Sequence, residues 1–280
     1  MKFRIGPRTS QIIAYSFLLV CTIFVISILI FIIAFVFKNG FTVLTWEFLT
    51  QKTKEMGKAG GIFPSIIGTV LVTLFAIAIA TPLGVGSALY LTEYTRGGTL
   101  RRLISFGADC LAGVPSIIFG LFGFIFFVIT LRFGWSIISG GLTLAVMILP
   151  TIIRTSEEAI KSVPKAYREI SYSLGVGKID TIIKLILPTA FPGILTGIIL
   201  GIGRAVSETA AVIFTAGSSL NMPTSIFSST RTLAVHFYIL AREGISMPKA
   251  YGTATVLIIS ILLINFIAYR LMHRFIARYY

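Results

Sequence analysis

Residues 164–188, PKAYREISYSLGVGKIDTIIKLILP, form a charge-rich interval in the second half of a chain that is otherwise mostly apolar. Long stretches without Asp, Glu, Lys or Arg lie on both sides of this interval. Of the 280 residues, 56% are hydrophobic and only 12% are charged, whereas soluble domains carry about 25% charged residues. We therefore expect an integral membrane protein with one structured polar segment that lies outside the bilayer and is available for contact with another molecule.

The apolar stretches predict the fold class. Six of them lack any charge: Thr9–Phe37, Ala59–Thr92, Cys110–Leu131, Phe133–Ile153, Leu185–Gly203 and Ala250–Tyr269. Each can supply the roughly 20 residues that a spanning helix needs, and none shows the alternation of a barrel strand. We predict a single all-α membrane domain over residues 1–280, with six spans at about 12–37, 64–91, 111–131, 140–153, 185–216 and 250–269.

The distribution of basic residues predicts the orientation. With the N-terminus inside, 15 of the 24 Lys and Arg fall in inner segments, eight fall in outer segments, and Arg204 lies within a span. Membrane proteins concentrate Lys and Arg on cytoplasmic loops. This asymmetry predicts a multi-pass protein with both termini in the cytoplasm, and it accounts for the net charge of +14 without nucleic acid.

The charged interval predicts a short amphipathic helix. Pro164 suits the first turn of a helix, and Ala166, Ile170 and Leu174 fall on one stripe. Gly175 can adopt the left-handed cap, and Asp180 is expected to cap the next helix. Such a helix could rest on lipid headgroups, but its narrow apolar stripe better suits a groove on a soluble partner.

The same residues resemble a motif of ABC-importer permeases, E-A-A, three residues, G, nine residues, I-x-L-P. Here Glu169-Ile170-Ser171, Gly175 and Leu185-Ile-Leu-Pro188 keep that spacing, although Ile170, Ser171 and Leu185 differ from the usual residues. The resemblance implies the MetI-like arrangement of six helices. It also implies that segment 164–178 is a cytoplasmic coupling helix. Its contact with an ATPase subunit would use the following residues: Ala166, Glu169, Ile170, Leu174, Gly175 and Pro188.

Further stretches resemble one branch of that family, the A-type permease subunits of bacterial phosphate importers. They are GGIFPSIIGT (60–69), PLGVGSALYLTEY (82–94), AGVPSIIFGLFG (112–123), LPTIIRTSEEAIKSVP (149–164) and GRAVSETAAVIFTAG (203–217). The resemblance implies a location in the cytoplasmic membrane, a C-type sister permease, a dimeric ATP-binding subunit and an extracytoplasmic phosphate-binding protein. Another oxyanion such as sulfate or molybdate, or a secondary anion transporter, remains an alternative.

Two charges in the fifth predicted span are candidates for an anion path. Arg204 and Glu208 are four residues apart and would share one face of a continuous helix. They could form a buried pair that fixes packing. Alternatively, Glu208 could hold Arg204 until an anion passes, because a guanidinium matches phosphate oxygens. Ser207 and Thr209 could add donors, and Arg154 is a second candidate. Arg231 is a weaker candidate, because its segment is interpreted as a solvated one outside the membrane.

The third predicted span contains Gly113, Pro115 and Ser116, which fit either a tightly packed kinked helix or a bend that lines a passage through the Ser116 hydroxyl. The sequence has no G-x-x-x-x-G-K-[ST] phosphate loop and no catalytic or metal-ligand cluster. We therefore predict a transporter membrane subunit without a cofactor or metal. ATP hydrolysis is assigned to a separate subunit.

Overall fold

The computed structural model describes residues 7–95 and 98–279 and is mainly helical. Its first half contains α1 (Pro7–Gly40), η1 (Phe41–Val43), α2 (Trp46–Thr50), β1 (Thr53–Lys54), η2 (Glu55–Gly57), β2 (Ala59–Gly60), α3 (Phe63–Leu89), η3 (Tyr90–Tyr94), α4 (Thr99–Ala112), α5 (Ser116–Gly123) and η4 (Phe124–Thr130). Its second half contains α6 (Ile137–Ser162), α7 (Lys165–Ser173), α8 (Lys178–Thr181), η5 (Ile182–Ile186), α9 (Leu187–Ser207), α10 (Ala210–Thr215), α11 (Leu233–Arg242) and α12 (Met247–Tyr279).

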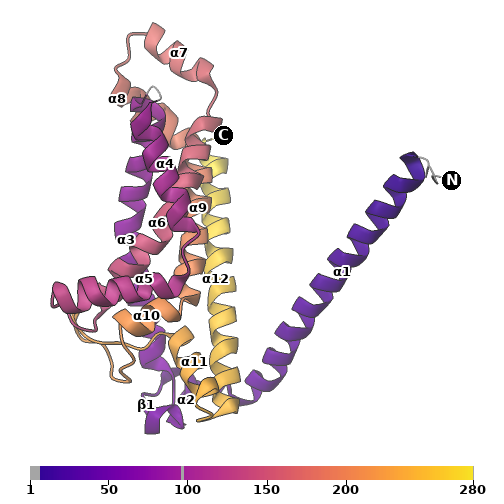
Figure 1. The fold of residues 1–280 in the computed structure, drawn as a ribbon, viewed down its shortest axis with the longest axis vertical. Helices are drawn as coiled ribbons and strands as arrows, with labels where there is room; N and C mark the ends of the chain where they lie inside the picture. Colours follow the sequence, from indigo (N-terminus) through magenta and orange to yellow (C-terminus); the bar gives the residue numbers. More distant parts are fainter. Residues whose placement is uncertain (1–6, 96–97, 280) are drawn as a thin grey trace.

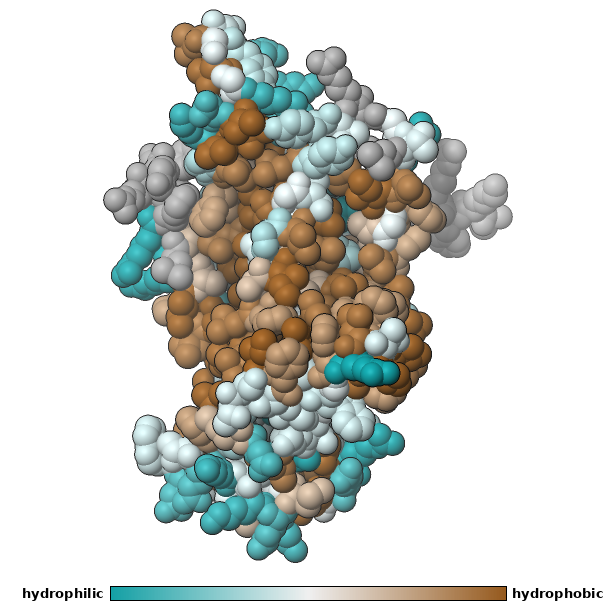
Figure 2. All heavy atoms as spheres, turned by 90° about the vertical axis from the view of Figure 1, so that its left-hand side faces the viewer, coloured by the Kyte–Doolittle hydropathy of each residue, from teal (hydrophilic) through white to brown (hydrophobic). Residues whose placement is uncertain are grey.

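The helices confirm an all-α membrane protein. In the described residues, five helical segments are long and apolar enough to cross a bilayer: Ser10–Val43, Phe63–Tyr94, Ile137–Ser162, Lys178–Ser207 and Met247–Arg274. A bent pair, Arg102–Ala112 and Ser116–Thr130, would provide a sixth span. Figure 2 shows the surface that such a protein needs, with an apolar belt between two polar ends.

The two ends of the molecule differ in structure. The first, called the α7 end below, carries α7 and α8, and α1 and α12 both point their chain termini toward it (Figure 1). The second, called the hairpin end, carries the short antiparallel pair β1–β2 together with α2 and α11 (Figure 1). The predicted charge asymmetry rests in part on Lys2, Arg4 and Arg96, which lie outside the described residues.

Helices α3, α6 and α9 form the centre of the bundle, and small residues allow them to approach closely. A side chain at Gly84 would collide with Ile152, and one at Gly197 would collide with Thr155. Close packing of this kind drives helix association where lipid removes the hydrophobic force. Helix α1 is the exception, because its apolar window is not buried against the rest of the chain, and it leans away from the bundle (Figure 1).

The structure corrects three predicted spans. The third is broken: α4 and α5 meet at an angle of 102°, and α5 lies across the bundle (Figure 1). Pro115 is the N-cap of α5. A proline disfavours helical angles at the residue before it, here Val114, and has no backbone N–H to donate, so α4 does not continue through it. The fourth span continues to Ser162, and residues 99–109, predicted as an inner loop, form most of α4.

The fifth predicted span is also broken. Helix α9 ends at Ser207, Glu208 has extended backbone angles, and α10 begins at Ala210. The predicted continuous helix through residue 216 is therefore wrong. The helices that follow the two breaks pack together, because a side chain at Gly120 of α5 would collide with the backbone of Ala211 in α10.

Candidate functional site

Helix α7 stands clear of the bundle and is exposed along nearly its whole length (Figure 1). Pro164 is the N-cap of α7, one residue before the first turn in which the sequence placed it. The apolar stripe faces solvent, with Ile170 59% and Leu174 76% exposed. Ala166 and Glu169 are also exposed. Exposed apolar side chains on a short helix outside the apolar belt are typical of a surface that a protein partner covers. Ala166, Glu169 and Ile170 therefore lie on one accessible helix and Leu174 at its C-cap, whereas Pro188 lies in α9.

The end of α7 has the backbone that its glycine predicts. Gly175 has a φ of +77°, in the left-handed region where L side chains are strained, and its amide donates to the Tyr172 carbonyl. The prediction for Asp180 is wrong. Gly177 is the N-cap of α8, while Asp180 lies inside the helix and pairs with Lys184 at 2.7 Å. Pro188 lies in the first turn of α9, where its missing donor costs little.

Arg168 fixes α7 to the bundle. Its Nη2 lies 2.7 Å from Glu93 Oε1 in η3, and it also donates to the carbonyls of Val163 and Ile160. The Glu93 side chain is only 6% exposed, so this ion pair is largely shielded from water. The sequence offers no partner for Arg168, because Glu93 lies 75 residues earlier in the chain.

Ser171, where the family motif has a small apolar residue, has a structural role. It is the one residue of α7 that is fully buried, and its hydroxyl lies 2.8 Å from that of Thr181 in α8. The Thr181 hydroxyl also contacts the Gly177 carbonyl at 3.0 Å. This polar contact fixes the turn between α7 and α8 and explains why a hydroxyl is tolerated at that position.

The break between α9 and α10 separates the two charges that were predicted to share a helix face. Arg204 lies in the last turn of α9, and Glu208 follows the helix end. Glu208 Oε1 accepts a hydrogen bond from the amide of Ala211 at 3.2 Å, so it caps α10. Within the described residues, no ion pair or hydrogen bond joins Arg204 to Glu208, and the Arg204 guanidinium has no protein partner.

The three hydroxyl residues predicted to line the path, Ser207, Thr209 and Ser116, have different surroundings. The Ser207 hydroxyl donates back to the Gly203 carbonyl at 2.9 Å, although its side chain is exposed. Thr209 lines a cavity between α5, α10 and α11. Ser116 is half-buried at the start of α5, directly after the bend. The structure thus brings Arg204, Glu208 and Thr209 to one helix break, with α5 packed against α10.

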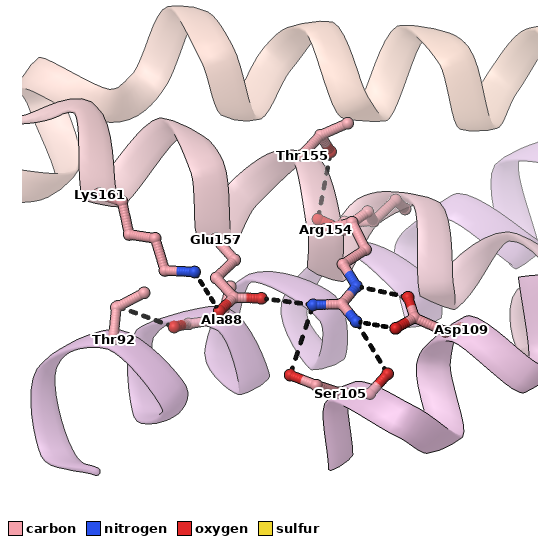
Figure 3. A network of polar contacts seen from close by, with 9 residues as sticks. Ala88, Thr92, Ser105, Asp109, Arg154, Thr155, Glu157 and Lys161 are labelled. Atoms are coloured by element: carbon pink, nitrogen blue, oxygen red, sulfur yellow. Dashed lines mark hydrogen bonds and ion pairs between the residues drawn. The ribbon is translucent and has the colours of Figure 1, made fainter. Parts of the chain in front are cut away.

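Arg154 has a different environment from Arg204 (Figure 3). Its Nε and Nη2 atoms bind both carboxylate oxygens of Asp109, at 3.0 and 2.6 Å, and its Nη1 lies 3.1 Å from Glu157 Oε2. It also donates to the Ser105 carbonyl at 2.8 Å. Glu157, only 2% exposed, bridges Arg154 to Lys161 at 2.6 Å. This network joins α4 to α6 and leaves the guanidinium no free edge, which favours a structural role.

Arg231 does not lie on a solvated segment, so that prediction is wrong. It is only 4% exposed, and its Nε donates to the Ser218 carbonyl at 3.0 Å. Burial lowers the pKa of the Arg231 guanidinium. Burial of the His236 ring, together with the nearby positive charges of Arg231 and Lys249, lowers the pKa of His236 to about 4. His236 is therefore neutral at physiological pH. The sequence offered no signal for this cluster, since its members come together only when α11 packs on the bundle.

Comparisons with known proteins agree with this geometry. Residues 80–279 match the family of binding-protein-dependent transport system inner membrane components. The chain belongs to this family. It is thus a multi-pass membrane subunit of a transport system rather than an enzyme, as the sequence predicted.

Individual relatives cover most of the permease chain. It is 34% identical to the probable ABC transporter permease protein YqgI of Bacillus subtilis, over 89% of this chain and 90% of that protein. It is 38% identical to the phosphate transport system permease protein PstA 1 of Mycobacterium tuberculosis, over 78% and 72%. The fold matches the inward-facing MetNI methionine ABC transporter with a TM-score of 0.60 and 20% identity, covering 77% of this chain and 94% of that one. These matches confirm the MetI-like permease arrangement.

Proposed function

We propose that this permease is the A-type membrane subunit of an ATP-driven importer of inorganic phosphate. Similarity to a phosphate transport permease supports the cargo, and the unpartnered guanidinium of Arg204 is the observation that carries the mechanism. A cation in an apolar helix without a carboxylate partner is costly, and such residues mark substrate pathways. An oxyanion would supply the missing partner, because a guanidinium binds its oxygens through forked donors.

The path that we propose passes through the break between α9 and α10. In the proposed orientation Arg204 would lie on its inner side and Thr209 on its outer side, and α5 packs against α10. Because Glu208 caps α10, it does not compete for Arg204, and the anion meets a free guanidinium. A single cation with one or a few hydroxyls binds an anion weakly enough to release it, as conduction requires.

The coupling surface that we propose is α7. A dimeric cytoplasmic ATP-binding subunit would cover Ile170 and Leu174, and the orientation would put the α7 end and both chain termini in the cytoplasm. Movement of α7 reaches α6 through residues 163–164, α9 through η5, and η3 through the Arg168–Glu93 pair. A C-type sister permease and an extracytoplasmic phosphate-binding protein would complete the importer in the inner membrane.

Uptake competition tests the cargo. The complete transporter is reconstituted in vesicles, and ATP-dependent uptake of labelled phosphate is measured with unlabelled phosphate, sulfate or molybdate in equal excess. We expect only unlabelled phosphate to compete. Stronger competition by sulfate or molybdate would assign another oxyanion. Uptake that follows an ion gradient without ATP would instead identify a secondary transporter.

A further inference from the structure

A cavity of about 800 Å³ lies between α5, α10, α11 and the loop that follows α10. These elements lie in the half of the molecule nearer the hairpin end, away from α7 (Figure 1). Its wall is apolar along α5 and carries several polar side chains elsewhere: Thr209, Ser218, Ser219, Ser229, Tyr238 and Arg242. The hydroxyl groups of Thr209, Ser218, Ser219 and Tyr238 can donate hydrogen bonds to an oxyanion, and the guanidinium adds a positive charge.

The charge of this cavity is not neutralised by its own wall. Among the described residues that line it, Arg242 is the one charged side chain and none is a carboxylate. Arg242 donates to the Tyr238 hydroxyl, and its guanidinium carbon lies 5.4 Å from the centre of the Tyr238 ring. In residues 7–95 and 98–279, Arg242 forms no ion pair. The tyrosine therefore orients the guanidinium while leaving its charge available.

The cavity adjoins the helix break that follows Arg204. Thr209 belongs to its wall and directly follows Glu208, at the start of α10. The loop wall is held in place by partly buried contacts: Arg231 donates to the Ser218 carbonyl at 3.0 Å, and the Ser229 hydroxyl donates to the Ala216 carbonyl at 3.0 Å. The cavity thus has a fixed wall and reaches the break at Thr209.

We propose that this cavity is an outer vestibule in which Arg242 and the wall hydroxyls hold a tetrahedral oxyanion before it reaches Arg204. The inference rests on the proposed function, because it names a second station on the same path. One exposed guanidinium with hydroxyls gives weak binding, which suits a station that must pass its anion onward. Free phosphate and a phospholipid headgroup share this chemistry, so the test separates them.

The test uses the complete transporter, without its binding protein, in maltoside micelles free of added phospholipid. All proteins carry Arg204→Gln, which removes the inner station, and the probe is the ³¹P line width of inorganic phosphate. Compared with the Arg204→Gln protein, the protein that also carries Arg242→Gln should broaden the ³¹P line of phosphate by about half as much or less, because charge-assisted hydrogen bonds to phosphate are lost. Arg242→Lys should reduce the broadening less. Arg132→Gln, an exposed arginine outside the cavity wall, should leave it unchanged.

Three results would overturn the proposal. Equal broadening with and without Arg242 would show that the cavity does not hold phosphate. A loss of co-purifying phospholipid in Arg242→Gln, with unchanged broadening, would assign the cavity to a lipid headgroup. Dissociation of the complex in Arg242→Gln but not in Arg132→Gln would place Arg242 in a subunit contact. Each result leaves the proposed function intact, since that depends on uptake competition and on Arg204.

Discussion

Arg154 and Arg204 are both arginines in apolar helices, and the structure gives them opposite surroundings. Arg154 binds Asp109 through two nitrogens and Glu157 through a third, and its network joins two helices. Arg204 ends a helix and has no protein partner in the part of the chain that the structure describes. A saturated guanidinium stabilises the fold, whereas a free one is available to a ligand. Residue type and hydropathy alone do not distinguish the two.

The largest effect on stability is expected when the Arg154 network loses its buried carboxylate. Glu157→Gln removes the negative charge that binds Arg154 and Lys161. It should lower the free energy of unfolding by about 3 kcal/mol, the low end for breaking a buried ion pair, because both cations are partly exposed. The melting temperature of the purified complex measures it. Glu158→Gln, an exposed neighbour, is the matched control. Equal melting temperatures for the two variants would contradict a structural role for the network.

A second saturated arginine, Arg168, should affect coupling more than folding. Arg168→Gln removes the ion pair with Glu93 that fixes α7. A shielded charged hydrogen bond contributes about 1.5 kcal/mol, and losing that free energy from the coupled arrangement of α7 corresponds to about a tenfold fall in coupled uptake. Transport per ATP hydrolysed is the measurement. Lys165→Gln, on the exposed side of the same helix, should behave as wild type. An unchanged transport ratio in Arg168→Gln would show that α7 needs no such anchor.

The smallest effect is expected at a neutral contact. Ser171→Ala leaves the buried Thr181 hydroxyl with one partner fewer and should cost about 1 kcal/mol, while the double variant with Thr181→Val should recover most of it. Thermal unfolding of the complex detects both. Ser173→Ala removes only a local contact on the exposed face and serves as the control. If the stability losses of Ser171→Ala and Thr181→Val simply add in the double variant, the two hydroxyl groups do not stabilise each other.

The sequence could predict the features that depend on local rules. The apolar runs located the bundle, Pro164 marked the start of α7, and Gly175 marked its left-handed end. These follow from hydropathy, from proline geometry and from the missing Cβ of glycine, all of which act within a few residues. The spacing of Glu169, Gly175 and Pro188 also located the segment that stands outside the bundle.

The features that the sequence could not predict depend on distant contacts. Hydropathy says nothing about the continuity of a helix, so the break after Ser207 was not predicted, whereas a bend near Pro115 was one of two alternatives that the sequence left open. Arg154 pairs with Asp109, which lies 45 residues earlier in the chain. Arg231 is buried through contacts with the loop after α10. The assumed Arg204–Glu208 pair failed because helical spacing was applied across a helix end.

The contrast between the two arginines is tested most directly by labelled phosphate uptake of Arg204→Gln, with its melting temperature measured beside Arg154→Gln. We predict that Arg204→Gln assembles and melts as wild type but loses uptake, and that Arg204→Lys keeps a part of it because charge remains without the fork. Arg154→Gln should lower the melting temperature. Normal uptake by an intact Arg204→Gln complex would contradict the proposed path.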